Sequence, residues 1–440
     1  MKHGFAKIKT TFGIGALILI LCSCSNASSP GAPSVSPSSP ISSPPVTSVP
    51  SPSGASPSET SSSEKPPSSD KDDISRLLES MTLEQKVGQL IIAGIDGTKF
   101  DEKMQQLITN QQVGGLILYK DNFSDLAGSV RLVNELKQGN ADNPLPLFMS
   151  VDQEGGTVSR LPKDFAALPN AIKVGKTGKP ELAEEMGGLL SKELRIMGFN
   201  MDFAPVLDVN SNPKNPVIGS RSFGTDAKLV ADMGVAAMRG LQAGGTIAVV
   251  KHFPGHGDTS VDSHLELPTV LKTVEQLEKL EWIPFRAAID QGADAVMIAH
   301  ILFPSIDPDS PSSLSKAVIT DLLRDRLGYD GVVITDDMTM GAIARNYGIE
   351  EAALQSFLAG SDLILVAHGY DTASQVYDKL LEAAQSGVIS EARLDASLRR
   401  IISLKQQYKL SDNSIPIPIP IPTATALPNE EIKQWLSQLQ

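Results

Sequence analysis

The stretch Gly244-Gly245-Thr246-Ile247-Ala248-Val249-Val250 runs directly into Lys251-His252-Phe253-Pro254-Gly255-His256-Gly257-Asp258-Thr259-Ser260-Val261-Asp262-Ser263-His264. The first part is short and apolar, which is typical of a buried strand. The second part holds three of the six histidines of the chain, and its proline and glycines exclude a helix. Because it offers almost nothing apolar to pack, we interpret it as a loop that handles a ligand, and not as a solvated loop that happens to be rich in histidine.

Apolar runs of this kind recur eight times, with amphipathic stretches between them. Eight strands that alternate with helices over about 300 residues predict an α/β fold, the (β/α)8 TIM-type barrel. A doubly wound sheet also alternates, but it usually carries a glycine-rich phosphate loop after its first strand, and Gly94-Ile95-Asp96-Gly97 lacks that pattern. The predicted strands are Gln89–Ala93, Gly115–Tyr119, Leu147–Val151, Met201–Val206, Ile247–Val250, Ala295–Ala299, Val332–Thr335 and Leu363–Val366, and the predicted helices include Glu181–Ile196, Ala227–Ala243, Val274–Gln291, Lys316–Leu327 and Ile349–Leu358.

The N-terminus predicts export. Residues 1–23 place basic residues before an apolar core, which indicates a signal peptide. Its end, Leu21-Cys22-Ser23-Cys24, resembles a bacterial lipobox. We expect a lipid anchor at Cys24 rather than Cys22, with ordinary secretion and loss of both cysteines as the alternative. In either case no cysteine pair remains in the folded part, which excludes disulfides and cysteine-based metal sites or nucleophiles there.

Composition divides the rest of the chain. Residues 24–71 are rich in Ser and Pro and predict a disordered linker. A single catalytic domain is expected over 72–411, where Asp73 caps the first helix and Thr82–Gln85 forms a capping box. Residues 412–440 form a tail with an Ile-Pro repeat and a short helix near Asn429–Gln440. The formal charge of −13 disfavours nucleic acid and anionic lipid as partners, and we expect a monomer.

Polar residues follow the predicted strands at the end where a barrel places its active site. Every histidine of the mature chain belongs to this rim, together with acids and two arginines. The rim residues are Asp152, Glu154 and Arg160 after the third run, Asp208 and Arg221 after the fourth, Lys251 and His252 after the fifth, His300 after the sixth, Asp336 and Asp337 after the seventh and His368 after the eighth.

Two features of the rim suggest glycosyl transfer. Asp336 ends an apolar strand, where a rigid carboxylate suits a nucleophile or a base. The alternative is a helix N-cap, which we favour for Asp337. Asp262 and His264 are two residues apart, so in an extended segment their side chains point the same way. The carboxylate then supports a charged imidazole whose other nitrogen can protonate a leaving oxygen.

Charged side chains surround these groups. Lys251, Arg160, Arg221 and Asp152 are suited to binding sugar hydroxyls. A fixed cation among them also keeps a nucleophilic carboxylate ionised.

The sequence resembles the β-N-acetylglucosaminidases of glycoside hydrolase family 3 over about residues 73–410. The resemblance implies that Asp336 is the nucleophile and that His264 with Asp262 is an acid/base dyad on a mobile loop. It implies a covalent glycosyl-enzyme and neither metal nor cofactor, and that Asp152, Arg160, Arg221, Lys251 and His252 bind the terminal N-acetylglucosamine. The segments that carry it are Val151–Gly156, Gly219–Gly224, Lys251–Gly257 with Asp262-Ser263-His264, and Thr335–Met340.

The expected function is therefore an exported, lipid-anchored exo-β-N-acetylglucosaminidase that acts on peptidoglycan fragments. A zinc-dependent barrel hydrolase is an alternative, which the Pro-Gly between His252 and His256 weakens. A lipid-anchored solute-binding protein is another, although it does not need the Asp262/His264 pair. Within the family, β-glucosidase activity or phosphorolysis stays open, because a neutral histidine in place of a carboxylate lets phosphate approach.

Overall fold

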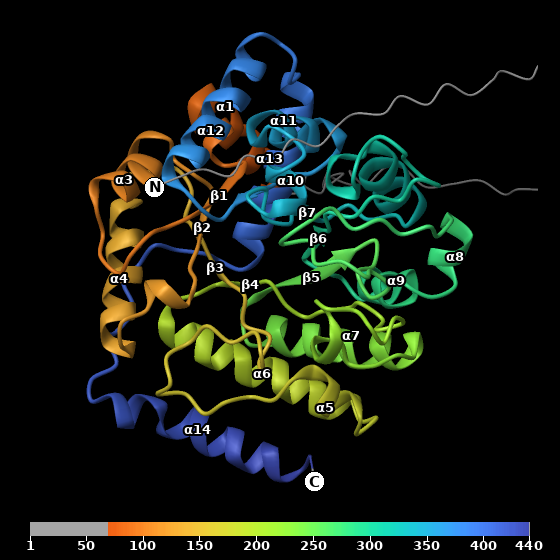
Figure 1. Ribbon diagram of the computed structural model, residues 1–440. Coiled ribbons are helices and arrows are strands. Elements are labelled where there is room, and N and C mark those ends of the chain that lie inside the picture. The colour runs from red at the N-terminus through yellow and green to blue at the C-terminus, as the bar shows by residue number, and fades with distance from the viewer. Residues whose placement is uncertain (1–68, 440) are drawn as a thin grey trace, which may run out of the picture. The chain divides into compact units, whose positions relative to one another are not determined.

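The computed structural model describes residues 69–439, and the side chains of residues 73–439. The predicted signal peptide, its cysteines and most of the predicted linker lie outside the described residues. Eight parallel strands follow the order β7-β6-β5-β4-β3-β2-β1-β8, and a parallel bridge between Ile334 and Leu363 joins the two ends. The predicted (β/α)8 TIM-type barrel is confirmed (Figure 1). The strands are β1 Ile91–Gly94, β2 Gly115–Ile117, β3 Phe148–Val151, β4 Met201–Asp202, β5 Ile247–Phe253, β6 Ala295–Ile298, β7 Val332–Thr335 and β8 Ile364–Val366.

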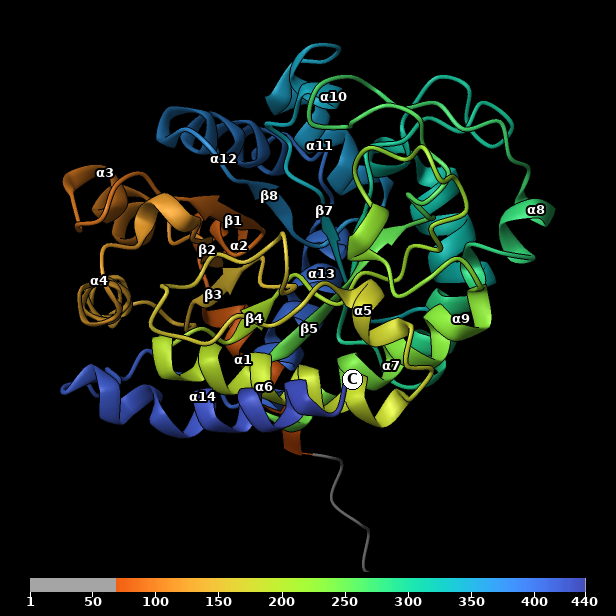
Figure 2. The same ribbon diagram turned by 60° about the horizontal axis from the view of Figure 1, so that its bottom comes forward.

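Helices surround the barrel (Figures 1 and 2), because each strand is buried on both faces and needs an apolar cover. The helices are α1 Ser69–Ser80, α2 Leu83–Gly88, α3 Glu102–Gln105, α4 Leu126–Gly139, α5 Ala171–Gly175, α6 Pro180–Met197, α7 Ala227–Ala243, α8 Val274–Glu278, α9 Trp282–Asp290, the π-helix η5 Ala317–Arg326, α10 Gly341–Ala344, α11 Ile349–Ala359, α12 Tyr370–Gln385, α13 Glu391–Gln407 and α14 Ile421–Ser437.

Most predicted elements are present, with local differences. The capping box at Thr82 and Gln85 forms as expected. Asp73 does not cap the first helix, because α1 already begins at Ser69. The single helix predicted from Val274 is two helices, α8 and α9. Pro284 explains the break, because a proline inside a helix lacks the N–H donor but is tolerated in the first turn of α9.

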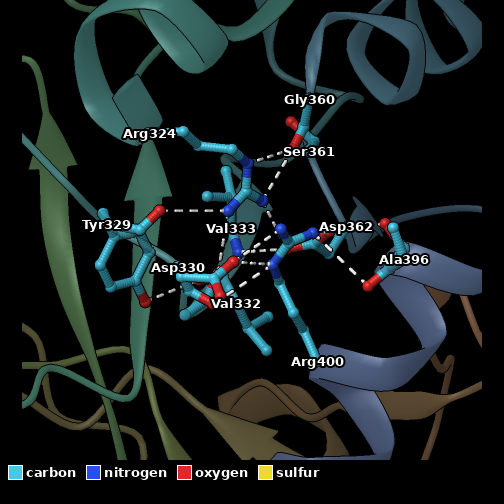
Figure 3. A network of polar contacts seen from close by, with 12 residues as sticks. Arg324, Tyr329, Asp330, Val332, Val333, Gly360, Ser361, Asp362, Ala396 and Arg400 are labelled. Atoms are coloured by element: carbon cyan, nitrogen blue, oxygen red, sulfur yellow. Dashed lines mark hydrogen bonds and ion pairs between the residues drawn. The ribbon is translucent and has the colours of Figure 1, made fainter. Parts of the chain in front are cut away.

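The N-terminal face of the barrel is closed by α13 and by buried ion pairs. Asp362, which precedes β8, has a fully buried side chain and pairs with Arg324 at 2.7 Å and Arg400 at 3.4 Å (Figure 3). Lys405 of α13 is also buried, and its ammonium donates to Gln89 Oε1 and to the carbonyls of Gly114 and Pro146. Asp362, Gln89, Gly114 and Pro146 all come before strands. They therefore lie at the face of the barrel where no catalytic group was predicted.

The C-terminal tail packs against the outside of the barrel. Its helix α14 begins at Ile421, inside the predicted Ile-Pro repeat, and not near Asn429. Proline in the first turn allows this, because the first helical N–H groups need no partner within the helix. Trp435 is buried against α6, and its indole N–H donates to the Leu182 carbonyl at 3.1 Å. Among residues 69–439, no helix combines the length and apolar character needed to cross a membrane.

Candidate active site

A pocket of about 870 Å³ opens at the C-terminal ends of the strands. Asp336 and His264 line it, as do the predicted sugar-binding residues Asp152, Arg160, Arg221, Lys251 and His252. Asp262 does not line it, but hydrogen-bonds His264. The structure therefore brings the predicted site residues together around one cavity.

Three charged side chains that line the pocket, Asp152, Arg221 and Lys251, form a cluster with Glu154, and we call these four residues the rim cluster. The Lys251 ammonium lies 2.5 Å from Asp152 Oδ1 and 2.7 Å from Glu154 Oε1. Arg221 binds Glu154 through both Nε, at 2.8 Å, and Nη2, at 2.7 Å. This two-point contact is the geometry in which a guanidinium holds a carboxylate most strongly.

The charges of the rim cluster are fixed by one another. Burial alone would raise the pKa of Glu154, but Arg221 and Lys251 hold that pKa far below its ordinary value. Burial alone would lower the pKa of Lys251, but Asp152 and Glu154 raise it. Lys251 is therefore a permanent cation in the pocket. A fixed cation was expected there from the sequence, because it keeps a nearby carboxylate ionised.

His252 is oriented by a buried aspartate. Its Nδ1 lies 2.7 Å from Asp208 Oδ2, so Nδ1 carries the proton and donates it to the carboxylate. The same Asp208 accepts the backbone N–H of His256 at 2.6 Å. His252 lines the pocket, and its Nε2 lies 3.5 Å from Arg221 Nη2.

Asp336 stands at the end of β7. Its Oδ1 accepts the backbone N–H of Asp337 at 2.9 Å. Burial would raise its pKa, but His300, His252 and the Asp337 N–H outweigh burial, so the pKa of Asp336 lies below its ordinary value. The carboxylate is thus ionised at neutral pH, which a nucleophile requires.

The Asp262/His264 pair forms as predicted. Asp262 Oδ1 accepts both the His264 backbone N–H, at 2.9 Å, and the Nδ1 proton, at 2.8 Å. These bonds outweigh the effect of burial and lower the pKa of Asp262. The His264 side chain is 62% exposed, so its Nε2 can reach a group that enters from solvent.

The opposite wall of the pocket carries aromatic rings and an unpaired cation. Tyr119, after β2, stacks on His368, after β8, with ring centroids 5.1 Å apart. The Arg160 guanidinium lies 5.7 Å from the centre of the Tyr119 ring. Arg160 makes no ion pair with any residue that the structure describes, and its buried Nε has no hydrogen-bond partner there. It is a donor that a ligand can satisfy.

The remaining rim residues have structural partners. His300 Nε2 donates to the Asp337 carbonyl at 2.9 Å, and its Nδ1 lies 2.6 Å from the Ser313 hydroxyl. Asp337 accepts from Thr339 N and Ala367 N, so it fixes a turn and is not a helix N-cap. The short helix that follows begins at Gly341.

His256 is held in the same way as His300. Its two ring nitrogens lie 2.9 Å from the Thr259 hydroxyl and 3.0 Å from the Ser263 hydroxyl. Burial lowers its pKa to about 4. Within residues 73–439, no group of three His, Cys, Asp or Glu side chains is placed to hold a metal ion.

Two functional residues were not assigned from the sequence. Glu154 links Lys251 to Arg221, and Asp208 orients His252. Both follow strands on the predicted rim, so their position was a signal, but nothing in the sequence indicated which cation each would meet.

Comparisons with known proteins agree with this geometry. Residues 82–404 match the glycosyl hydrolase family 3 N-terminal domain. The chain is 32% identical over 344 residues to a β-hexosaminidase A of Pseudoalteromonas piscicida, and the match covers 73% of this chain and 58% of that protein. It is 35% identical to a β-hexosaminidase of Xylella fastidiosa (strain M23), with 63% of this chain and 83% of the relative covered.

A solved structure gives the same result. The family 3 β-N-acetylglucosaminidase from Paenibacillus sp. str. FPU-7 superposes with a TM-score of 0.77 at 46% identity, covering 81% of this chain and 68% of that one. The matched parts hold the barrel and its rim, and the first relative extends well beyond them. The chain belongs to glycosyl hydrolase family 3, and it is similar to the β-hexosaminidases named above.

Proposed function

We propose that the protein is a retaining exo-β-N-acetylglucosaminidase that forms a covalent glycosyl-enzyme on Asp336. The observation that carries the proposal is the pairing of two groups at one cavity. Asp336 is a carboxylate with a lowered pKa, and His264 is an imidazole whose Nδ1 is held by Asp262. A retaining glycosidase needs these two functions, a nucleophile and a group that gives and later takes a proton.

In the first step Asp336 Oδ2 attacks the anomeric carbon of the terminal sugar. The bond to the leaving oxygen breaks, and His264 Nε2–H donates its proton to that oxygen. The products are a glycosyl ester on Asp336, the free aglycone and a neutral His264, with Asp262 still holding Nδ1.

In the second step water attacks the anomeric carbon from the face that the aglycone left. Neutral His264 takes a proton from this water, and the ester bond to Asp336 breaks to release the carboxylate. Two inversions retain the β-configuration of the sugar.

The rim cluster and Arg160 are suited to hold the terminal sugar. Lys251, His252 and Arg160 present donors or acceptors into the pocket, and Asp152 offers a carboxylate that is 19% exposed. Charged hydrogen bonds to sugar hydroxyls that strengthen in the transition state contribute to rate as well as to binding.

The test is release of 4-nitrophenol from its β-N-acetylglucosaminide. Asp336→Asn should lower kcat by roughly 10⁴-fold or more without a change in melting temperature, and NMR should detect the β-anomer of the wild-type product first. Near-normal turnover by Asp336→Asn, or the α-anomer first, would contradict the proposal. An absence of turnover on this substrate and on the matching glucoside would favour a solute-binding protein.

Three further arms separate the alternatives. His264→Ala should slow substrates with poor leaving groups more than activated aryl glycosides, and an equal loss on both would argue against acid/base chemistry. A strong gain in rate with phosphate, and sugar 1-phosphate as product, would identify a phosphorylase. Loss of activity with a chelator, restored by zinc, would support the metal-dependent alternative.

Location and natural substrate are part of the same proposal. The lipobox-like end at Cys24 and the Ser/Pro-rich linker support an exported enzyme held at the cell membrane by a lipid. A surface-held N-acetylglucosaminidase would meet GlcNAc-terminated cell-wall fragments. Mass spectrometry of the mature N-terminus, and digestion of purified muropeptides, test the anchor and the aglycone separately.

A further inference from the structure

A second polar pocket of about 600 Å³ lies at the N-terminal face of the barrel, away from the active site. Its walls are the last turns of α4 and α6 and the segment that connects α13 to α14. Helices end at this face because each leads into the N-terminal end of the next strand. Asn200, which also lines the pocket, immediately precedes β4.

Lys137 of α4 points its ammonium into this pocket without a partner. The residue is only 5% exposed, yet among the described residues Nζ has neither a hydrogen-bond acceptor nor a carboxylate within ion-pair distance. Burial lowers the pKa of Lys137, Asp412 raises it, and Arg195 lowers it again. Asp412 acts from beyond ion-pair distance, and its two oxygens already accept from Asn140 and from the Leu147 N–H.

Lys405 provides a contrast within the same face. It is more deeply buried than Lys137, and its ammonium has three oxygen acceptors between 2.6 and 2.9 Å. The Lys137 ammonium instead keeps contact with solvent through the pocket, because its Nζ is not among the fully buried atoms without a partner. Lys137 therefore lacks what Lys405 has, and the missing acceptor has room to enter from the pocket.

The other walls supply only donors or neutral groups. Arg195 and Lys409 line the pocket and make no ion pair within the described part of the chain, and no carboxylate lines it. Ser411 and Ser414 contribute hydroxyls. This is unusual in a chain with a formal charge of −13.

The wall formed by the connecting segment is held in place. Ile415 N donates to Asn134 Oδ1, and Asn134 Nδ2 donates to the Ile415 carbonyl, both at 2.9 Å. Figure 1 shows this segment passing beside α4 before α14 begins. The donors are therefore arranged before any ligand arrives, which lowers the entropic cost of binding.

Helix dipoles explain only part of this arrangement. Lys137 and Arg195 both lie in the last turn of a helix, where a cation is favoured. That preference is satisfied by an exposed side chain and does not require one that is 5% exposed and has no acceptor among the described residues.

We propose that this pocket binds a phosphate group, either free or as a phosphodiester in a polymer, through Lys137, Arg195 and Lys409. A tetrahedral oxyanion offers three or four acceptors, which match an ammonium, a guanidinium and two serine hydroxyls better than the two oxygens of a carboxylate do. The pocket is open to solvent, so a sugar or glycerol attached to the phosphate can extend out of it.

The experiment measures binding of radiolabelled inorganic phosphate by equilibrium dialysis at low salt. Wild type should bind at one saturable site, and Lys137→Met should weaken binding at least tenfold. Lys228→Met, at an exposed lysine of α7 paired with Asp232, is the matched control and should bind as wild type does. Lys251→Met should also keep binding, because its change lies at the active site.

Two additions make the outcome decisive. Hydrolysis of the aryl glycoside by Lys137→Met should be unchanged, and its melting temperature equal to or above that of wild type, because the lost ammonium has no partner among the described residues. Competition by glycerophosphodiester stronger than by phosphate would identify a polymer as the source, and the reverse would identify free phosphate. No saturable binding, equal binding by Lys137→Met, loss in Lys251→Met, or equal competition by acetate would overturn the proposal.

Discussion

The barrel carries a buried carboxylate–cation cluster at each end, and the two ends differ in how completely the buried polar atoms around each cluster are hydrogen-bonded. The rim cluster lies at the C-terminal face. The base cluster, Asp362 with Arg324, Arg393 and Arg400, lies at the N-terminal face (Figure 3). Asp362 accepts from Arg324, from the Val333 N–H and from the Ser397 hydroxyl. The other N–H groups of Arg324 donate to backbone carbonyls of neighbouring turns.

The rim side leaves polar atoms unused. Among residues 73–439 eight buried side-chain atoms have no hydrogen-bond partner, and four of them belong to β4 or to the loops after β3 and β4. These four atoms are Arg160 Nε, Asp202 Oδ2, Asn210 Oδ1 and Ser211 Oγ. None of them belongs to the rim cluster or to the base cluster. Arg160 lines the active-site pocket, where a ligand can complete its hydrogen bonds.

Removing the cation of the rim cluster should give the largest loss of activity among changes to the two clusters. Lys251→Met leaves the carboxylates of Asp152 and Glu154 facing each other without the ammonium that joins them. We expect kcat/KM to fall roughly 10³-fold, or about 4 kcal/mol. Steady-state kinetics measures this, and the free energy of unfolding from urea titration should change less than it does in the base-cluster variant described next.

Removing the anion of the base cluster should do the reverse. Asp362→Asn leaves Arg324 and Arg400 buried without their counter-charge, and we expect a loss of about 3 kcal/mol of unfolding free energy. The kcat/KM of the folded fraction should stay within threefold of wild type. Asp330→Asn is the control, since this partner of Arg400 is 89% exposed and should cost little. If both clusters affected activity and stability alike, the division between the two faces would be wrong.

The same division explains what the sequence could predict. The eight strands and the rim followed from hydrophobic runs and from the residues after them, because a barrel places every strand end on a known face. Asp262 and His264 could be selected from their spacing, and Asp336 from its position at the end of an apolar strand.

Long-range partners could not be predicted in this way. Nothing local to Glu154 indicates Arg221, and nothing near Asp362 indicates Arg400, because these contacts depend on how distant elements pack. The tail shows the same limit. An Ile-Pro repeat suggests an extended segment, and only the packing of Trp435 against α6 shows that a helix forms there. The bound phosphate that we propose depends on Lys137 and Arg195, which are far apart in the chain and individually look like ordinary helix-end cations.

A smaller effect should appear in the pH profile. His252 is one of the groups that lower the pKa of Asp336, so His252→Gln should raise that pKa. Because kcat/KM requires ionised Asp336, the acid limb of the profile should move to higher pH, by about half a unit. Lys228→Met should leave the limb unchanged. A limb that stayed in place, or moved to lower pH, would mean that His252 does not act electrostatically on the nucleophile.

The smallest effect should come from the contact between the tail and the rim. Asn429 of α14 accepts from the Ala166 N–H at 2.6 Å and donates to the Asp164 carbonyl at 2.8 Å. Ala166 and Asp164 lie in the loop after β3, and the same loop carries Arg160. Asn429→Ala should cost about 1 kcal/mol of unfolding free energy and raise KM two- to threefold with kcat unchanged, since Arg160 binds the sugar but does not react. Gln434→Ala, at an exposed position of the same helix, should alter neither, and a loss in kcat would instead connect the tail to the reacting groups.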